Sequence, residues 1–270
     1  MSTPATLHYR FPGAQRIVSA RIDAPELIPH VQQFYAAYRC PAPHGDVGQG
    51  EAIAVEREGH DYRVAVASGA WEAENVGDAV LFFEYELTDE LLHDAGDLVH
   101  LHGAAVFRDE RCLLLIGPSG AGKSTLALGL SLSGWNVLAD DALLIDPRDC
   151  GVQPFDRSIR VHEASLRALD IDANYVPGAR LCDPYLWLAP IPGSHRATRY
   201  PSGLVFLKGG AETKMERLGA AVTLKELLAA RLSDQAQRDF DCLARLAAQS
   251  PGYRLSFEDF PAALAELRRL

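Results

Sequence analysis

The first 96 residues place apolar and polar positions at two different spacings, which predict strands and helices in turn. From residue 78 to 95 the apolar residues recur at helical spacing, and the segment ends before Gly96. Residues 31–38 also favour a helix, and the Pro- and Gly-rich stretch 41–50 is typical of a loop. We therefore expect a smaller α+β domain over residues 1–96. Its strands are predicted at residues 7–11, 16–22, 52–55 and 62–67, where β-branched and aromatic residues recur.

The pattern changes at about residue 97, where we place the start of a second domain that runs to residue 270. Two apolar strands are predicted at 99–107 and 111–116, joined by a turn at Asp109-Glu110. A glycine-rich loop follows the second strand directly. The remaining strands of this domain are predicted at residues 135–139, 142–145 and 203–207.

The C-terminal region is expected to be helical. Thr223 and Glu226 match a capping box, in which each side chain accepts a hydrogen bond from the other residue's backbone amide at the start of a helix. Residues 234–248 carry apolar side chains at helical spacing, and Pro261 is typical of the first turn of a last helix.

The glycine-rich loop is the most specific chemical signal in the chain. It reads Gly-Pro-Ser-Gly-Ala-Gly-Lys-Ser-Thr, which matches Gly-x-x-x-x-Gly-Lys-[Ser/Thr] between an apolar strand and a helix predicted from Thr125 to Ser133 and closed by Gly134. Glycine allows backbone angles that point several amides at one anion, and the positive end of the helix adds to the attraction. We predict a nucleotide phosphate site formed by Gly117, Pro118, Ser119, Gly120, Ala121, Gly122, Lys123, Ser124 and Thr125.

Two side chains of this loop have predicted roles of their own. Lys123 supplies a positive charge between the outer phosphates, and Ser124 offers a hydroxyl to Mg²⁺. The expected cofactors are ATP and Mg²⁺. A glycine-rich turn with an incidental lysine is the alternative interpretation, and the flanking strand and helix speak against it.

Asp140 and Asp141 form the second chemical feature. They follow the strand predicted at 135–139, so their carboxylates should emerge at the same sheet edge as the phosphates. There they could bind Mg²⁺ or accept a proton from an attacking hydroxyl, which makes both Asp140 and Asp141 candidates for either role. A helix cap or an Asx turn is the alternative use of such residues.

Three further residues are weaker candidates. His102 lies on the strand predicted to pair with the one before the loop, although a single histidine is more often structural than catalytic. Arg157 and Arg160, in PFDRSIRVHE, could steady the charge on a transferring phosphoryl group of the substrate. Their alternative is an ordinary exposed position on the surface.

Composition disfavours several classes of protein. The formal net charge of −10 argues against a nucleic-acid surface, which needs clustered Lys and Arg. No stretch approaches the run of about 20 apolar residues that spans a bilayer, and the N-terminus lacks the apolar core of a signal peptide. The five cysteines are scattered and form no Cys-x-x-Cys pair, which disfavours disulfide and zinc frameworks. We expect a cytoplasmic protein without nucleic-acid or membrane partners.

The segment LHGAAVFRDERCLLLIGPSGAGKSTLALGLSLSGWNVLADDALLI resembles the catalytic core of the HPr kinase/phosphorylase family, bacterial enzymes that phosphorylate a serine of a phosphocarrier protein. The shared pattern is a His-Gly strand, a short hairpin, the phosphate loop, a helix ending in Gly and an Ala-Asp-Asp strand end. The resemblance covers residues 99–146. It implies an α/β fold, with a P-loop domain whose mixed sheet is of the HPr kinase and phosphoenolpyruvate carboxykinase type.

The resemblance also implies roles for single residues. Lys123 and Ser124 would hold phosphate and Mg²⁺, Asp140 would be the catalytic base, and Asp141 would contact both the metal and His102. HPr kinases form hexamers, so the resemblance implies a possible homo-oligomer.

The chain departs from the family at two places. Thr125 stands where the family has an acidic residue, and no Glu-x-Arg-Gly-Leu-Gly loop follows residue 146. That loop helps to form the phosphocarrier site, so HPr is not the expected substrate. The chain is more similar to divergent relatives that include kinases of lasso-peptide precursors.

These observations favour ATP- and Mg²⁺-dependent transfer of the γ-phosphoryl group to a hydroxyl, that of Ser or Thr in a peptide or protein. Two alternatives stay open: a kinase of a free small molecule, and a nucleotide sensor without transfer chemistry. A GTPase switch is disfavoured, because the chain has no Asn-Lys-x-Asp motif for reading the base.

Overall fold

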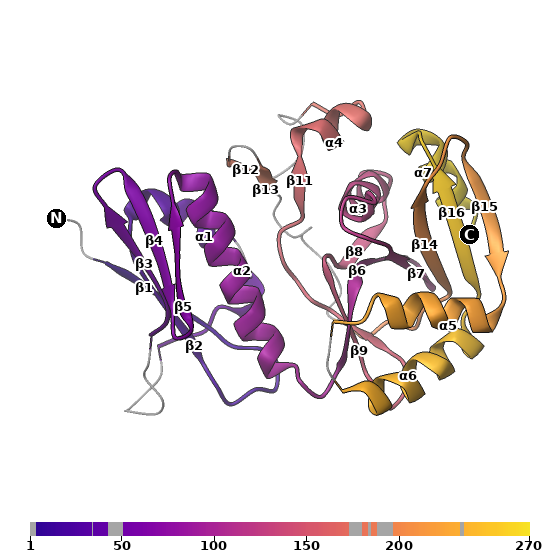
Figure 1. The fold of residues 1–270 in the computed structure, drawn as a ribbon, viewed down its shortest axis with the longest axis horizontal. Helices are drawn as coiled ribbons and strands as arrows, with labels where there is room; N and C mark the ends of the chain where they lie inside the picture. Colours follow the sequence, from indigo (N-terminus) through magenta and orange to yellow (C-terminus); the bar gives the residue numbers. More distant parts are fainter. Residues whose placement is uncertain are drawn as a thin grey trace. The chain divides into compact units, whose positions relative to one another are not determined.

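The protein is an α/β protein with mixed sheets, and its contacts divide the chain into two compact units. One unit comprises residues 1–96 and 178–189, and the other comprises 97–177 and 190–270. Each unit has a sheet of its own (Figure 1). The computed structural model describes residues 4–33, 35–42, 51–172, 180–182, 185–187, 197–232 and 235–270.

The first unit is built on a five-stranded sheet in the order β1-β2-β3-β4-β5. Only β2 and β3 run parallel, and α2 (Val76–Asp94) packs along the sheet (Figure 1). The side chain of Asn75 caps this helix by accepting a hydrogen bond from the amide of Asp78. The strands are β1 (Ala5–Tyr9), β2 (Val18–Asp23), β3 (Glu51–Glu58), β4 (Asp61–Val66) and β5 (Gly69–Ala73).

The single helix expected over residues 31–38 is wrong. The structure has a short helix α1 (Ile28–Val31), preceded by the 3₁₀ turn η1 (Pro25–Leu27), and then a separate 3₁₀ turn η2 (Ala36–Tyr38). Tyr35 lies between the two helical pieces with a φ of 47°, in the left-handed region, which ends helical geometry. Residue 34 and most of the predicted loop 41–50 lie outside the described residues.

The second unit contains an eight-stranded mixed sheet in the order β10-β9-β6-β7-β14-β16-β15, with β8 also paired to β6. The pairs β7–β14 and β14–β16 are parallel, and the other pairs are antiparallel. The predicted turn between β6 and β7 is confirmed, and Asp109 adopts a φ of 55° in it. The strands are β6 (Val99–Arg108), β7 (Arg111–Ile116), β8 (Asn136–Ala139), β9 (Ala142–Ile145), β10 (Val152–Gln153), β14 (Gly203–Gly209), β15 (Lys214–Leu218) and β16 (Gly252–Phe257).

The helix α3 (Lys123–Ser131) follows the glycine-rich loop and begins two residues before the predicted start at Thr125. The last helix, α7 (Phe260–Arg269), has Pro261 in its first turn as predicted, and the side chain of Asp259 caps it. Two other helices, α5 (Ala220–Ala229) and α6 (Ala236–Gln249), pack against each other. Smaller elements are β11 (Arg160–His162), α4 (Glu163–Ala168), β12 (Arg180–Cys182) and β13 (Tyr185–Trp187).

The predicted capping box at Thr223 is wrong. The helix α5 begins at Ala220 with Gly219 as its N-cap residue. Thr223 lies inside the helix, is buried, and donates its hydroxyl hydrogen to the carbonyl of Gly219, 3.1 Å away. Ser and Thr side chains often bond the carbonyl four residues earlier, and a capping pattern in the sequence does not exclude this use.

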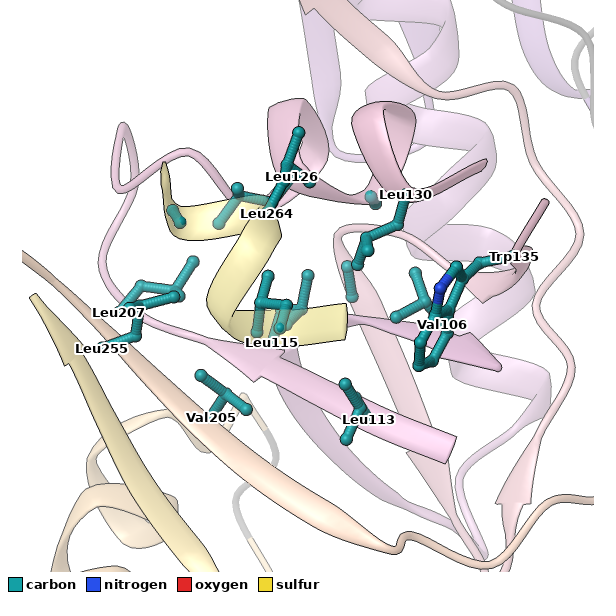
Figure 2. Close-up of a cluster of buried hydrophobic side chains, with 14 of the residues drawn as sticks. Val106, Leu113, Leu115, Leu126, Leu130, Trp135, Val205, Leu207, Leu255 and Leu264 are labelled. Atoms are coloured by element: carbon teal, nitrogen blue, oxygen red, sulfur yellow. The ribbon is translucent and has the colours of Figure 1, made fainter. Parts of the chain in front are cut away.

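The core of the second unit lies between the sheet and the helices α3 and α7 (Figure 2). Leu126 and Leu130 from α3 and Leu264 from α7 meet strand residues such as Leu115 and Val205, and all are fully or almost fully buried. Each such side chain contributes about 1.5–3 kcal/mol to stability through the removal of apolar surface from water. The glycine-rich loop and α3 are therefore held on a packed layer.

Candidate functional site

The glycine-rich loop joins β7, a strand paired on both of its edges, to α3. Gly120 and Gly122 have φ values of +77° and +88°, which other residues adopt only with strain. At Gly122 a Cβ atom would also lie 2.7 Å from Cε1 of Phe260. Gly122 is required for two reasons, its backbone angle and the ring of Phe260.

The backbone amides of the loop are available to a ligand. Within the described part of the chain, no acceptor is found for the amides of Ser119, Gly120, Gly122, Lys123 and Ser124. Amides without an acceptor at the positive end of a helix attract an anion. Residues 118–120 are also exposed, so an anion can reach the loop from solvent.

Lys123 is buried beneath this loop, with 6% of its surface exposed. Its Nζ donates to the carbonyl oxygens of Gly117 and Pro118, each 2.9 Å away. Burial lowers the pKa of Lys123, while the carboxylates of Asp141 and Asp140 act in the opposite direction. The ammonium group therefore lies inside the turn of the loop, where the negative charges of Asp140 and Asp141 also attract it.

Asp140 and Asp141 lie at the junction of β8 and β9, two short strands that both pair with β6. Asp141 has a φ of +71°, so the chain turns sharply there and the two carboxylates have different surroundings. Asp tolerates this conformation better than most residues.

The carboxylate of Asp140 faces the loop helix. It accepts a hydrogen bond from the hydroxyl of Ser124, with 2.9 Å between Oγ and Oδ1 and 3.0 Å between Oγ and Oδ2. Only 2% of the residue is exposed. Burial raises the pKa of Asp140 to about 6, and Arg157 gives the largest opposing effect. Asp140 is thus a carboxylate that changes its charge close to neutral pH.

The carboxylate of Asp141 has two basic neighbours. Nη1 of Arg157 lies 3.1 Å from its Oδ2, and Nδ1 of His102 lies 3.3 Å from its Oδ1 and 3.0 Å from its backbone oxygen. Burial acts to raise the pKa of Asp141, but Arg157, His102 and Arg160 together lower it below its usual value. As the pH falls below about 6, Asp140 therefore becomes protonated first, while Asp141 stays ionised.

A small cavity of about 10 Å³ adjoins Asp140 and is also lined by Phe155 and Arg157. This is about the volume needed to hold one water molecule.

The structure brings most of the candidate residues together. The loop residues Lys123 and Ser124 adjoin Asp140, and His102 and Arg157 adjoin Asp141. Arg160 is half-buried on β11 and acts on Asp141 through its charge. Thr125, the last residue of the loop motif, is buried in the first turn of α3.

Two features of the site were missed by sequence reasoning. Arg157, considered there as a contact for substrate, has only 2% of its side chain exposed and forms an ion pair with Asp141. Phe260, which packs against Gly122, had no signal at all. Both contacts join segments far apart in the chain, so no local pattern could have indicated them.

Among the described residues, no group of three or more His, Cys, Asp or Glu side chains is placed to hold a metal ion. Mg²⁺ usually binds through one or two carboxylates together with substrate phosphates and waters. The paired oxygens of Ser124 and Asp140 fit that chemistry. The carboxylate of Asp141 is engaged with Arg157 and His102.

No protein-family model matches the sequence, and a search of curated proteins finds no match. Among the helices of the described residues, none has both the length and the apolar character needed to cross a bilayer.

Proposed function

We propose that the chain is an ATP- and Mg²⁺-dependent kinase, similar to the HPr kinase family, that transfers the γ-phosphoryl group to a serine or threonine hydroxyl of a peptide or protein. The observation that carries the proposal is the hydrogen bond of 2.9 Å between Ser124 and Asp140. It joins the loop suited to phosphates to the acid suited to proton transfer.

In this proposal the loop holds the phosphates of ATP. The amides of Ser119, Gly120, Gly122, Lys123 and Ser124 donate to phosphate oxygens, and the ammonium group of Lys123 moves from the loop carbonyls to the phosphate charge. Mg²⁺ would be held by Ser124 and by the phosphates, and it would supply charge neutralisation.

Asp140 is the proposed general base. Its pKa of about 6 leaves it ionised at neutral pH, so it can take the proton of an attacking hydroxyl. The oxygen of that hydroxyl then bonds to the γ-phosphorus while the bond from this phosphorus to the bridging oxygen of ADP breaks.

Asp141 is proposed to position the site, which differs from the metal role expected for it. Its ion pair with Arg157 and its contact with His102 hold the acidic turn between β8 and β9. Arg157 also keeps a positive charge close to Asp140, which favours the ionised form of that carboxylate before it takes the proton.

The test is to incubate the protein with γ-labelled ATP, Mg²⁺ and a library of serine- and threonine-containing peptides. Wild-type protein should label these peptides and should not label the matching alanine peptides. Asp140→Asn should lower transfer by about 100-fold or more, within the range of general base catalysis, and still bind ATP. The matched control is Asp109→Asn, which makes the same charge change at an exposed turn away from the loop.

Three results would contradict the proposal. Full transfer by Asp140→Asn would reject Asp140 as the base. Labelling of metabolites alone from a small-molecule pool would indicate a small-molecule kinase, and ATP binding without any labelled product would indicate a nucleotide sensor.

A further inference from the structure

The first unit carries a groove that the proposed kinase site does not use. It has a volume of about 400 Å³ and is lined by residues 10–15, which follow β1, and by residues 37–40, which begin within η2 and continue beyond it. The two segments are joined by backbone hydrogen bonds from Arg10 to Tyr38 and from Cys40 to His8. The walls of the groove are therefore fixed, and its volume lies within the range of about 300–1,000 Å³ that is usual for ligand sites.

The charge of the groove is entirely positive. Arg10 and Arg39 line it and are exposed, and its lining segments contain no Asp or Glu. The guanidinium of Arg39 lies 5.9 Å from the ring centre of Tyr9. In the part of the chain that the structure describes, neither arginine has a carboxylate partner.

The other arginines among the described residues of the range 4–96 differ in this respect. Each forms an ion pair with a carboxylate of the same unit, as Arg16 does with Asp94 and Arg57 with Glu26. The remaining two, Arg21 and Arg63, both pair with Glu56. In a chain with a net charge of −10, two arginines without acids in one groove leave a local site for an anion.

Two buried aromatic residues support the wall of the groove. The rings of Phe11 and Tyr38 lie 6.0 Å apart and nearly parallel, at 12°, and both residues line the groove. Above this support the exposed guanidinium groups can meet the carboxylates of a ligand, which guanidinium groups bind through two parallel hydrogen bonds. Because several lining residues are exposed, the groove suits a chain that lies across it.

We propose that this groove is a binding site for an acidic peptide segment, with Arg10 and Arg39 as its two carboxylate contacts. Two arginines are too few for nucleic acid, whose binding rests on many phosphate contacts. The proposal is independent of phosphoryl transfer, because it concerns binding by the first unit.

The test is the fluorescence anisotropy of labelled hexaglutamate added to the full chain at low ionic strength, with labelled hexaglutamine as the neutral comparison. We expect hexaglutamate to bind, hexaglutamine not to bind, and added salt to weaken the complex. The double variant Arg10→Ala/Arg39→Ala should bind about tenfold more weakly. Arg10→Lys/Arg39→Lys should keep part of the affinity, because the charge remains and the planar fork is lost.

The control is Arg57→Ala/Arg63→Ala, which removes the same charge at the other end of the sheet. The register places Tyr9 opposite Val18, whereas Arg57 and Arg63 adjoin Glu56, which pairs with Asp23 at the far end of β2. This variant should bind like the wild type. Undiminished binding by a folded Arg10→Ala/Arg39→Ala protein, or no binding of hexaglutamate at all, would overturn the proposal. Equal affinity for free glutamate and hexaglutamate would also overturn it, since that result describes a small-anion pocket.

Discussion

The hydroxyl of Ser124 donates a hydrogen bond to the carboxylate of Asp140, and the oxygens are 2.9 Å apart. Ser124 lies in the first turn of α3, Asp140 follows β8, and both elements pack against β6. The loop and the acid are thus held at a fixed spacing by the packing of the elements that carry them. A site prepared in this way loses less conformational entropy when a nucleotide binds.

Lys123→Ala should abolish stabilisation by nucleotide. A ligand present at about 100 times its Kd stabilises a protein by about 2.7 kcal/mol, and this stabilisation requires the loop to hold the phosphates. The measurement is thermal unfolding with and without Mg²⁺-ATP. Lys225→Ala, which removes an exposed lysine from α5, should retain the full shift. An unchanged shift in Lys123→Ala would reject the phosphate role of the loop.

Asp140→Asn should raise the free energy of unfolding at neutral pH. The pKa of about 6 in the folded protein lies above the usual value of 3.8, so the folded form binds more protons between about pH 4 and pH 6. Stability therefore falls as pH rises through this interval, and asparagine avoids the loss. We expect a gain of up to about 3 kcal/mol near pH 7.5, which shrinks towards pH 4. Urea unfolding of the wild type and Asp140→Asn at pH 7.5 and pH 4 measures this gain in stability. An equal gain at the two pH values would contradict the explanation.

Asp141→Asn should have the opposite effect and destabilise the protein by about 1–3 kcal/mol at neutral pH. It leaves the guanidinium of Arg157, with 2% of its side chain exposed, without its carboxylate. The pKa of Asp141 is lowered in the folded protein, so its contribution is present above the usual pKa and is lost as pH falls through the folded value.

The comparison for this variant is Asp109→Asn, because asparagine tolerates a positive φ and Asp109 is exposed. Urea unfolding should show little change for Asp109→Asn. If both variants lost the same stability, backbone conformation and not the lost ion pair would be responsible.

Gly122→Ala should cost more stability than Gly134→Ala. Both glycines have a φ near +86°, at +88° and +85°, so both substitutions introduce backbone strain of about 1 kcal/mol. A Cβ at Gly122 would also lie 2.7 Å from Phe260, whereas none of the described atoms lies within 4 Å at Gly134. The additional cost of overpacking is about 1–3 kcal/mol. Chemical unfolding of the two variants gives the difference directly, and equal losses would argue against the contact with Phe260.

Local patterns in the sequence were enough to predict β6, β7, the turn between them and α3. Each is defined by neighbouring residues, such as the apolar run before Gly117 and the glycine at 134. The mixed sheet is also as expected. The pairing of β14 with β7 and β16 could not be derived, because it joins segments that are about 50–90 residues apart. The strands β15 and β16 were not predicted, and the helix start at Ala220 was misplaced by a Thr-Glu spacing that the fold does not use as a cap.

The candidate site, like the fold, could be predicted from the sequence only in part. The loop, Asp140 and Asp141 carry a signal in their own sequence, and the structure places them next to one another. The contrast between the two acids depends on burial and on Arg157, which is 16 residues from Asp141. Asp140 and Asp141 are identical neighbours in the sequence. The sequence therefore could not predict that the pKa of Asp140 is raised and the pKa of Asp141 is lowered.

The strand β7, which carries the loop, is bonded along both edges, to β6 on one side and to β14 on the other. Its amides are closed to solvent unless the sheet itself opens. Hydrogen–deuterium exchange at Leu113 and Leu115 should therefore be among the slowest in the chain and should proceed through global opening of the second unit. The amides of Ser119 and Gly120, a few residues further along, should exchange within seconds and should slow only when an anion occupies the loop.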